Sequence, residues 1–338
     1  MISKIQNEEY EKIGESLNCD LTNKTFLITG ANGLIGSYLV DYLDFAGAKV
    51  YAMSRSIDKL QKRFKNKANV ELIEQDLNEP LNLNMSFDFI IHTASNSHPL
   101  AFSKDPVGTM KTNLFGTINL LEHIKKTKGK FLYLSTGEIY GNNIDHSFIE
   151  EDLGMVDTKI ARSCYPESKR AAETLSVSYN AQYNINVNVA RLCYVYGPTI
   201  TEDNSRADAQ FLRNALENKD IIMKSKGEQK RTYCYVADAV SALLYILLKG
   251  ENAQVYNIAN PDSIVSVAQY AKTLADITGV NLKFELPDAV EAKGYSKQAD
   301  SILSAQKLID IGWKPLYDIK QGLKNTIKIK KELECLKV

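Results

Sequence analysis

Apolar residues between positions 21 and 197 follow two alternating patterns. Short runs rich in β-branched and aromatic residues predict strands at 25–29, 48–53, 70–73, 87–92, 130–135 and 186–193. Longer amphipathic stretches between them predict helices at 34–46, 107–125 and 165–181. Because a helix between two strands acts as a crossover connection, neighbouring strands run parallel. The pattern therefore predicts an α/β fold with a doubly wound parallel sheet.

The pattern changes after Gly197-Pro198, where the elements become shorter and the loops carry more charge. We therefore expect residues 21–197 to form one α/β domain. Residues 198–338 are expected to form mainly a smaller, mixed α/β region that faces the substrate, with segments that return to the first domain. Residues 1–20 form an N-terminal extension, which is charged throughout, is unlike a signal peptide and is compatible with a short amphipathic helix.

The charge balance argues against several classes of partner. The chain has 41 basic and 41 acidic residues among 338, so no global field favours nucleic acid or a membrane surface. No apolar run approaches the roughly 20 residues of a membrane-spanning helix. The five cysteines have no paired or metal-binding spacing, which predicts free thiols in a reducing cytoplasm and no metal site.

A glycine-rich turn follows the first predicted strand and opens the first predicted helix. Its residues are Gly30, Ala31, Asn32, Gly33, Leu34, Ile35 and Gly36. The first glycine permits a tight turn, the second lets the backbone approach a pyrophosphate, and the third lets the helix pack closely on the strand. The N–H groups at the start of the helix would then meet the phosphates. The turn predicts a bound dinucleotide, with GxxGxxG spacing in place of the commoner GxGxxG.

The second predicted strand ends in Ser54-Arg55-Ser56, where NAD-binding domains usually carry an Asp or Glu for the ribose hydroxyls. In the absence of that carboxylate, Arg55 is a candidate for the 2′-phosphate of NADP. The alternative is a solvated arginine after a strand. Asp76-Leu77, after the third strand, is placed to meet the adenine, and Asp76 is equally suited to cap a helix or a turn. The sequence thus leaves NAD and NADP open.

Tyr165 and Lys169 stand four residues apart, on one face of a predicted helix. The lysine ammonium would favour the phenolate and lower the pKa of the tyrosine. Such a tyrosine can remove a proton from a sugar hydroxyl as hydride leaves the carbon. A YxxxK pair occurs often by chance. It gains weight beside the glycine turn and the segment 135–138, where Thr136 supplies a hydroxyl and Glu138 a carboxylate at the end of a strand.

The motifs GANGLIG, LSTGEIYG, YPESK, RLCYVYGP and RTYCYVAD stand in the order typical of extended short-chain dehydrogenases/reductases, the NAD-dependent epimerase/dehydratase family. The chain resembles this family from Thr25 nearly to its end. The resemblance implies a Rossmann domain, bound NAD or NADP, a nucleotide-diphosphate sugar as substrate, and a homodimer. It also implies a catalytic group of Thr136, Tyr165 and Lys169. The cofactor contacts expected on the family pattern are Gly30, Asn32, Gly33, Leu34, Ile35, Gly36, Ser54, Arg55, Asp76, Leu77, Ala94, Ser95, Asn113, Ser135, Tyr165 and Lys169.

Every branch of this family begins by oxidising the sugar, usually at C4, and Glu138 helps to distinguish the branches. A carboxylate near C5 suits proton transfer there, as in sugar 4,6-dehydratases and UDP-glucuronate decarboxylases. The stretch RSCYPESKR (162–170) and the loop at 92–117 resemble the decarboxylases more. That branch places diphosphate contacts at Arg206 and Arg231. Further candidate substrate contacts are His98, Glu138, Arg162 and Tyr194.

Three departures from the decarboxylase pattern keep other reactions open. Gly137 replaces the Asp of the dehydratases and the Ser of the decarboxylases, Tyr194 replaces a substrate-binding asparagine, and Lys297 stands near an arginine of the decarboxylases. The predicted enzyme oxidises the sugar at C4 and then acts at C5 or C6, most like a UDP-glucuronate decarboxylase. The alternatives are a nucleotide-sugar 4,6-dehydratase, a 4-epimerase or reductase, and a non-catalytic sensor of the dinucleotide.

Several histidine and cysteine side chains are expected to have structural roles and no catalytic role. His92 ends a predicted buried strand and is expected to be a packing histidine. Cys164 has no base dedicated to it and is expected to pack as well. His123 and His146 are expected to lie on the surface.

Overall fold

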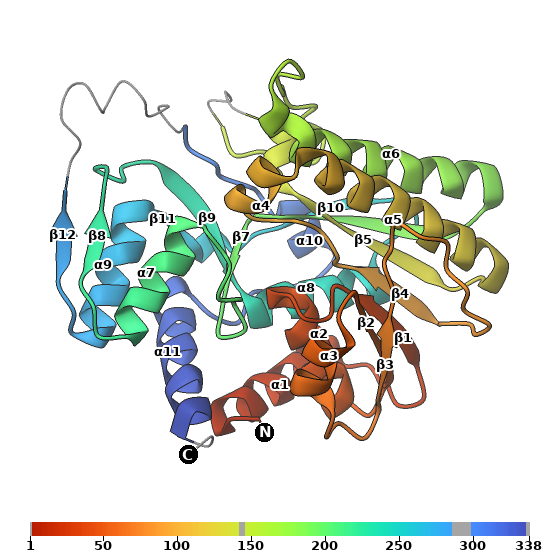
Figure 1. Cartoon of the computed structure of the whole chain (residues 1–338), viewed down its shortest axis with the longest axis horizontal. Coiled ribbons are helices and arrows are strands. Elements are labelled where there is room, and N and C mark those ends of the chain that lie inside the picture. The colour runs from red at the N-terminus through yellow and green to blue at the C-terminus, as the bar shows by residue number, and fades with distance from the viewer. Residues whose placement is uncertain (1, 142–145, 286–298, 336–338) are drawn as a thin grey trace.

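A seven-stranded sheet forms the centre of the computed structural model, which describes residues 2–141, 146–285 and 299–335 (Figure 1). Every strand pairs in parallel with its neighbours, in the order β10-β6-β5-β4-β1-β2-β3. The strands are β1 (Thr25–Thr29), β2 (Lys49–Ser54), β3 (Val70–Glu74), β4 (Phe89–His92), β5 (Lys130–Thr136), β6 (Asn186–Leu192) and β10 (Val255–Ile258). The order reverses direction between β1 and β4, which is where ligands bind in doubly wound sheets. The predicted Rossmann α/β fold is confirmed.

Helices cover both faces of this sheet (Figure 1). One face carries α5 (Pro106–Thr127) and α6 (Cys164–Tyr183), with the short α4 (Pro99–Lys104) before them. The other face carries α2 (Leu34–Phe45) and α8 (Val236–Lys249), while α3 (Ile57–Phe64) joins β2 to β3. Alternate residues of β1 serve the two faces: Phe26 and Ile28 belong to one buried cluster and Leu27 to the other. Burial on both faces explains why these strands read as continuous apolar runs.

The chain after β7 (Tyr194–Tyr196) builds two small sheets, ordered β11-β9-β7 and β12-β8. Their strands are β8 (Ile221–Met223), β9 (Lys230–Tyr235), β11 (Ile264–Ser266) and β12 (Leu282–Phe284). The helices of this part are α7 (Ala207–Leu216), α9 (Val267–Thr278), α10 (Gln306–Asp310) and α11 (Ile319–Cys335). Two late elements belong to the layers of the large sheet: β10 is its edge strand and α8 packs on one face.

The N-terminal extension forms the amphipathic helix α1 (Lys4–Leu17), which starts in a capping box between Ser3 and Gln6. It lies beside α11, so the first and last helices of the described residues are neighbours (Figure 1). The Glu9 carboxylate accepts hydrogen bonds from the Tyr38 hydroxyl at 2.6 Å and the Asn325 amide at 2.7 Å. These contacts fasten α1 and α11 to α2.

Candidate active site

A cavity of about 2280 Å³ runs along the carboxyl ends of the central strands. Its lining includes the turn after β1, the ends of β2 and β5, the loop after β4, and segments 200–207 and 222–229. Single-ligand pockets usually measure roughly 300–1,000 Å³. The cavity therefore has room for two ligands of nucleotide size, one on each side of the switch point.

The glycine turn has the close approaches that its sequence predicts. Gly30 has a positive φ of +62°, and a Cβ there would lie 2.7 Å from the Cα of Ala94. A Cβ on Gly36 would overlap the Gly30 carbonyl oxygen, so strand and helix pack closely there. Gly33 lines the cavity at the start of α2, where no side chain caps the helix. The first N–H groups of α2 are thus available to a phosphate, and the turn fits a dinucleotide.

Most of the predicted cofactor contacts line this part of the cavity. They are Gly30, Asn32, Gly33, Leu34, Ile35, Gly36, Ser54, Arg55, Asp76, Leu77, Ala94, Ser95, Ser135, Tyr165 and Lys169. Asn113 is the exception, because it is fully buried and lies behind the wall. Its amide donates to the Ser168 hydroxyl at 2.8 Å and accepts from the Ser95 hydroxyl at 2.8 Å. Asn113 therefore positions Ser95 from behind the wall of the cavity, and a direct contact with the cofactor stays a prediction.

Three of the predicted catalytic residues meet where β5 ends beside α6. Tyr165 is 7% exposed, stacks on Phe102, and accepts a hydrogen bond from the Thr136 hydroxyl. Lys169 is buried one helical turn further on, and its ammonium donates to the Leu134 carbonyl at 2.7 Å. All three line the cavity.

The electrostatics of this group differ from the expectation. Burial raises the pKa of Tyr165, the Glu138 carboxylate raises it further, and the hydrogen bond from Thr136 offsets part of the rise. Burial also lowers the pKa of Lys169 to about 7, against an opposing effect of Glu173. The predicted lowering of the Tyr165 pKa by Lys169 is therefore wrong for this arrangement. The Lys169 Nζ lies 6.0 Å from the centre of the Tyr165 ring and donates its hydrogen bond to the Leu134 carbonyl.

Glu138 lies in the next turn of chain, at the start of a short 3-10 helix (Gly137–Tyr140). Its carboxylate is ion-paired with the Arg162 guanidinium at 2.6 Å, and Arg162 stacks over the ring of Phe102 at 4.2 Å. Both charged groups line the cavity. Beside them, a Cβ on Gly137 would lie 2.9 and 3.0 Å from the methyl carbons of Leu303. Leu303 fills the place that a side chain at 137 would need.

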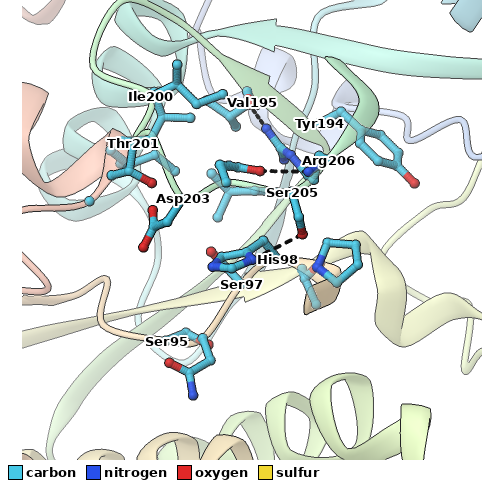
Figure 2. Close-up of a pocket in the computed structure, with 18 of the residues that line it drawn as sticks. Ser95, Ser97, His98, Tyr194, Val195, Ile200, Thr201, Asp203, Ser205 and Arg206 are labelled. Atoms are coloured by element: carbon cyan, nitrogen blue, oxygen red, sulfur yellow. Dashed lines mark hydrogen bonds between the residues drawn. The ribbon is translucent and has the colours of Figure 1, made fainter. Parts of the chain in front are cut away.

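The opposite part of the cavity holds the other predicted substrate contacts, of which Figure 2 labels His98, Tyr194 and Arg206. The His98 Nδ1 shares a hydrogen bond with the Ser205 hydroxyl at 3.2 Å. The Arg206 guanidinium donates to the Val195 carbonyl at 2.7 Å and is ion-paired with Asp208 at 3.2 Å. The Arg231 guanidinium lies over the ring of Tyr194 at 4.4 Å. Both arginines line the cavity, as a diphosphate site requires.

Sequence reasoning missed several residues of this part. Asp208 is 3% exposed and holds Arg206, but a lone acid in an amphipathic helix carries no signal of that role. The loop between β8 and β9 contributes Lys224, Ser225 and Lys226 to the wall, and α7 contributes Gln210 and Asn214. These residues have no motif, and only the folded chain brings them to the cavity.

The remaining histidine and cysteine predictions are mostly supported. Cys164 is buried, and burial raises the pKa of its thiol. His92 is buried, and its Nδ1 pairs with the Thr29 hydroxyl at 2.8 Å, while its Nε2 has no hydrogen-bond partner among the described residues. His146 is exposed, but His123 is only 7% exposed, so its surface placement is wrong. Lys297 lies outside the described residues.

The sequence model of the NAD dependent epimerase/dehydratase family matches residues 26–259. The chain belongs to this family. UDP-glucuronic acid decarboxylase 4 of Arabidopsis thaliana is 33% identical over 306 residues, which cover 89% of this chain and 67% of that protein. UDP-glucuronic acid decarboxylase 1 of Xenopus tropicalis is 32% identical over 315 residues, which cover 92% of this chain and 73% of that protein. The predicted family is confirmed, and with it a nicotinamide dinucleotide as cofactor.

Several solved structures share the fold of the chain. An epimerase of Methanothermobacter thermautotrophicus has a TM-score of 0.82 at 19% identity, over 98% of this chain and 97% of that one. The UDP-glucose 4-epimerase of Thermotoga maritima, solved with UDP-glucose, has a TM-score of 0.77 at 26% identity, over 92% of this chain and 99% of that one. The dTDP-glucose 4,6-dehydratase of Bacillus anthracis, solved with NAD, has a TM-score of 0.75 at 22% identity, over 92% and 97%. Among the described residues of our chain, no helix is long and apolar enough to cross a membrane.

Proposed function

We propose that the chain is a UDP-glucuronate decarboxylase, which oxidises the sugar at C4, releases C6 as carbon dioxide and reduces the ketone again. The observation that carries this choice is the Arg162 guanidinium, which lines the cavity 2.6 Å from Glu138 and offers a cation to a C6 carboxylate. A side chain at 137 would meet Leu303 carbons at 2.9 and 3.0 Å, so the position next to Glu138 has no room for a second acid. The relatives at 33% identity, named as UDP-glucuronic acid decarboxylases, support the same choice.

The two reactions at C5 and C6 make different demands on this wall. Dehydration needs a base for the C5 proton and an acid for the hydroxyl that leaves C6. In decarboxylation the electrons of the C5–C6 bond flow into the C4 carbonyl as carbon dioxide leaves, and the enolate that forms takes one proton at C5. With Leu303 in the neighbouring place, Glu138 suits one proton transfer better than two.

The chain's own groups would carry the protons. Tyr165 would take the proton of the C4 hydroxyl and later return it, with Thr136 hydrogen-bonded to its oxygen. A nicotinamide dinucleotide, when bound, supplies the hydride acceptor for the oxidation and the hydride donor for the later reduction. Because burial raises the pKa of Tyr165, its phenolate needs positive charge nearby. The Arg206 and Arg162 guanidinium groups lower that pKa, and the Lys169 ammonium, 6.0 Å from the ring centre, would add to them. Glu138 would deliver the proton to C5.

Three arginines would hold the substrate. Arg206 and Arg231 would bind the diphosphate, because a guanidinium matches phosphate oxygens with two parallel donors. Arg162, which is paired with Glu138 at 2.6 Å, would hold the C6 carboxylate until it leaves. With a nucleotide hexose, which lacks that carboxylate, Arg162 would stay ion-paired with Glu138.

We also propose a homodimer that pairs through α5 and α6, which lie side by side on one face of the molecule (Figure 1). On α5, Val107 is 63%, Met110 38% and Phe115 46% exposed, and on α6 Val177 is 42% exposed. Several large apolar side chains on two adjacent helices support a protein interface. Sedimentation velocity should give twice the 37.9 kDa of one chain, and a single species of one chain would contradict the dimer.

The test of the reaction is the product formed from UDP-glucuronate in heavy water, read by mass spectrometry and NMR. We expect release of carbon dioxide, a UDP-pentose with one deuterium at C5, and no net consumption of the dinucleotide. UDP-glucose is the matched control, because it differs only at C6, and we expect no product from it. Loss of water from a nucleotide hexose would overturn the proposal in favour of a dehydratase, and inversion at C4 alone in favour of an epimerase.

A further inference from the structure

We infer that this chain takes NADP in preference to NAD, through a subsite for the 2′-phosphate built by Arg55, Lys59 and Lys62. The inference concerns the cofactor end of the cavity and does not depend on which sugar reaction the chain performs. It sets the chain apart within a family described as NAD-dependent.

The end of β2 lacks the group that NAD-binding domains use. In a Rossmann domain this strand end meets the adenosine ribose, where a carboxylate accepts hydrogen bonds from the ribose hydroxyls and repels a 2′-phosphate. Here the position holds Ser54, whose hydroxyl accepts from the Asn32 amide at 2.9 Å and from the Ser56 N–H at 3.1 Å. The hydroxyl is neutral, so it offers no repulsion to a phosphate.

Positive charge is concentrated at the same place. Arg55 follows β2 directly, Lys59 and Lys62 project from α3, and all three line the cavity. Among the described residues none of the three is ion-paired with a carboxylate. Arg63 also lines this end, but its guanidinium is paired with Asp41. A 2′-phosphate carries up to two negative charges, so three cations without an ion-paired carboxylate are well matched to it.

The carboxylates near the end of β2 already accept hydrogen bonds from other groups or lie on another segment. The Glu74 side chain accepts from the Ile57 N–H at 3.1 Å and does not line the cavity. Asp76 lines it after β3, and its carboxylate accepts from the Asn78 N–H at 2.9 Å. Asp203, on the facing loop, has its pKa lowered mainly by a hydrogen bond with Thr201, with smaller effects of His98 and Lys59. Arg55 directly follows the strand end that meets the ribose, so we expect it to carry most of the discrimination.

The experiment uses the full chain and measures binding, without reference to turnover. Dinucleotide released by denaturation is identified by mass spectrometry, and stripped protein is then titrated with NADP and with NAD by calorimetry. We expect NADP in the released fraction and an NADP affinity at least about 10-fold above that for NAD. Arg55→Ala should weaken NADP binding about 10- to 100-fold, the usual cost of hydrogen bonds to a charged group. It should change NAD binding less than about 2-fold.

Two further variants sharpen the result. Arg55→Asp restores a carboxylate to the strand end and should reverse the preference toward NAD. Lys272→Ala removes an exposed cation of α9 that is paired with Asp276 at 3.1 Å and does not line the cavity, so both affinities should stay unchanged. Retained NAD binding in Arg55→Ala also shows that the variant is folded. Equal or tighter binding of NAD by the unaltered chain, or equal losses for both dinucleotides in Arg55→Ala, would overturn the inference and leave the proposed reaction untouched.

Discussion

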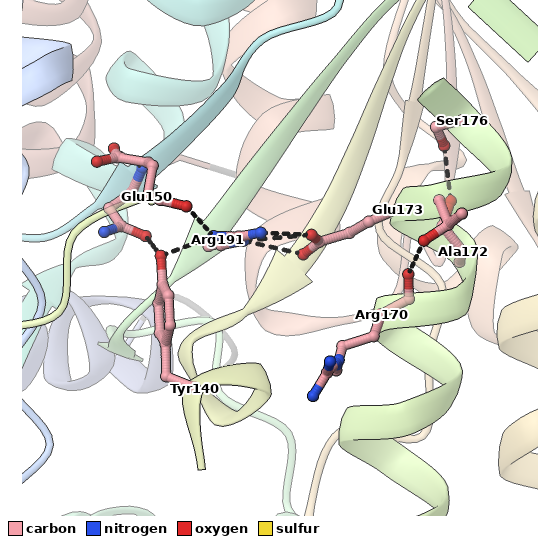
Figure 3. A network of polar contacts seen from close by, with 9 residues as sticks. Tyr140, Glu150, Arg170, Ala172, Glu173, Ser176 and Arg191 are labelled. Carbon is pink, nitrogen blue, oxygen red and sulfur yellow. Dashed lines mark hydrogen bonds and ion pairs between the residues drawn. The ribbon is translucent and has the colours of Figure 1, made fainter. Parts of the chain in front are cut away.

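Glu173→Gln removes one charge from a buried ion pair and should destabilise the fold by roughly 3–5 kcal/mol. Glu173 on α6 accepts three hydrogen bonds from Arg191 on β6, at 3.2, 3.2 and 2.8 Å. Their side chains are 9% and 11% exposed, so water has little access to replace the lost partner. Figure 3 shows the pair at the centre of a network that also includes the Tyr140 hydroxyl and the Glu150 carbonyl.

The lower part of this range is the better estimate. Glutamine keeps one side-chain oxygen that can accept from Arg191. The Tyr140 hydroxyl and the Glu150 carbonyl also continue to accept, each at 2.9 Å. The cost is therefore that of a buried guanidinium whose acceptors are all neutral, about 3 kcal/mol. Against a total stability of about 5–15 kcal/mol for a folded protein, this loss is large enough to measure.

Urea unfolding followed by circular dichroism provides the assay. Glu167→Gln is a matched control on the same helix, because the Glu167–Arg170 pair spans 3.5 Å with side chains 31% and 36% exposed. Such pairs contribute less than about 1 kcal/mol. Adding Arg191→Met to Glu173→Gln removes the unpaired cation and should recover part of the loss. A loss in Glu173→Gln no larger than in Glu167→Gln would refute the reasoning.

Three further predictions concern the site and its surroundings. Tyr165→Phe should abolish turnover and leave dinucleotide binding, measured by titration, unchanged; retained turnover would remove Tyr165 from its role. Gly137→Ser should destabilise the fold by about 1–3 kcal/mol through overpacking against Leu303, and Leu303→Ala in the same chain should restore stability in urea unfolding, whereas no rescue would mean that another contact is responsible. Burial raises the pKa of Asp238 to about 7, so the folded chain keeps a proton that the unfolded chain releases above about pH 4, and stability from this group is lost as pH rises to about 7. Urea unfolding at pH 5 and pH 8 should show a loss on the order of 2 kcal/mol that is smaller in Asp238→Asn; equal losses would contradict it.

The parts of the fold that sequence predicted correctly depend on local patterns. The strands of the large sheet are buried on both faces and so read as short apolar runs, and the helices between them have one apolar side. The glycine turn and the Tyr165–Lys169 pair were also visible, because spacing along one turn or one helix determines their geometry. Thr136 belongs with these, since the end of β5 places it beside the tyrosine. Each of these predictions needs only residues that are close in sequence or share one element.

The predictions that failed required knowledge of packing between distant segments. The place of Asn113 behind the cavity wall also depends on packing, because its amide donates to Ser168 on α6. Tyr165 and Lys169 have the predicted spacing, but burial decides their pKa values, and burial is a property of the whole fold. Leu303 shows the same dependence most directly, because its contact with Gly137 joins the end of β5 to a segment after β12. Glycine at 137 differs from the motifs of two branches, and the sequence alone gives no reason for it. Beside Leu303, the packing leaves no room for a side chain at this position.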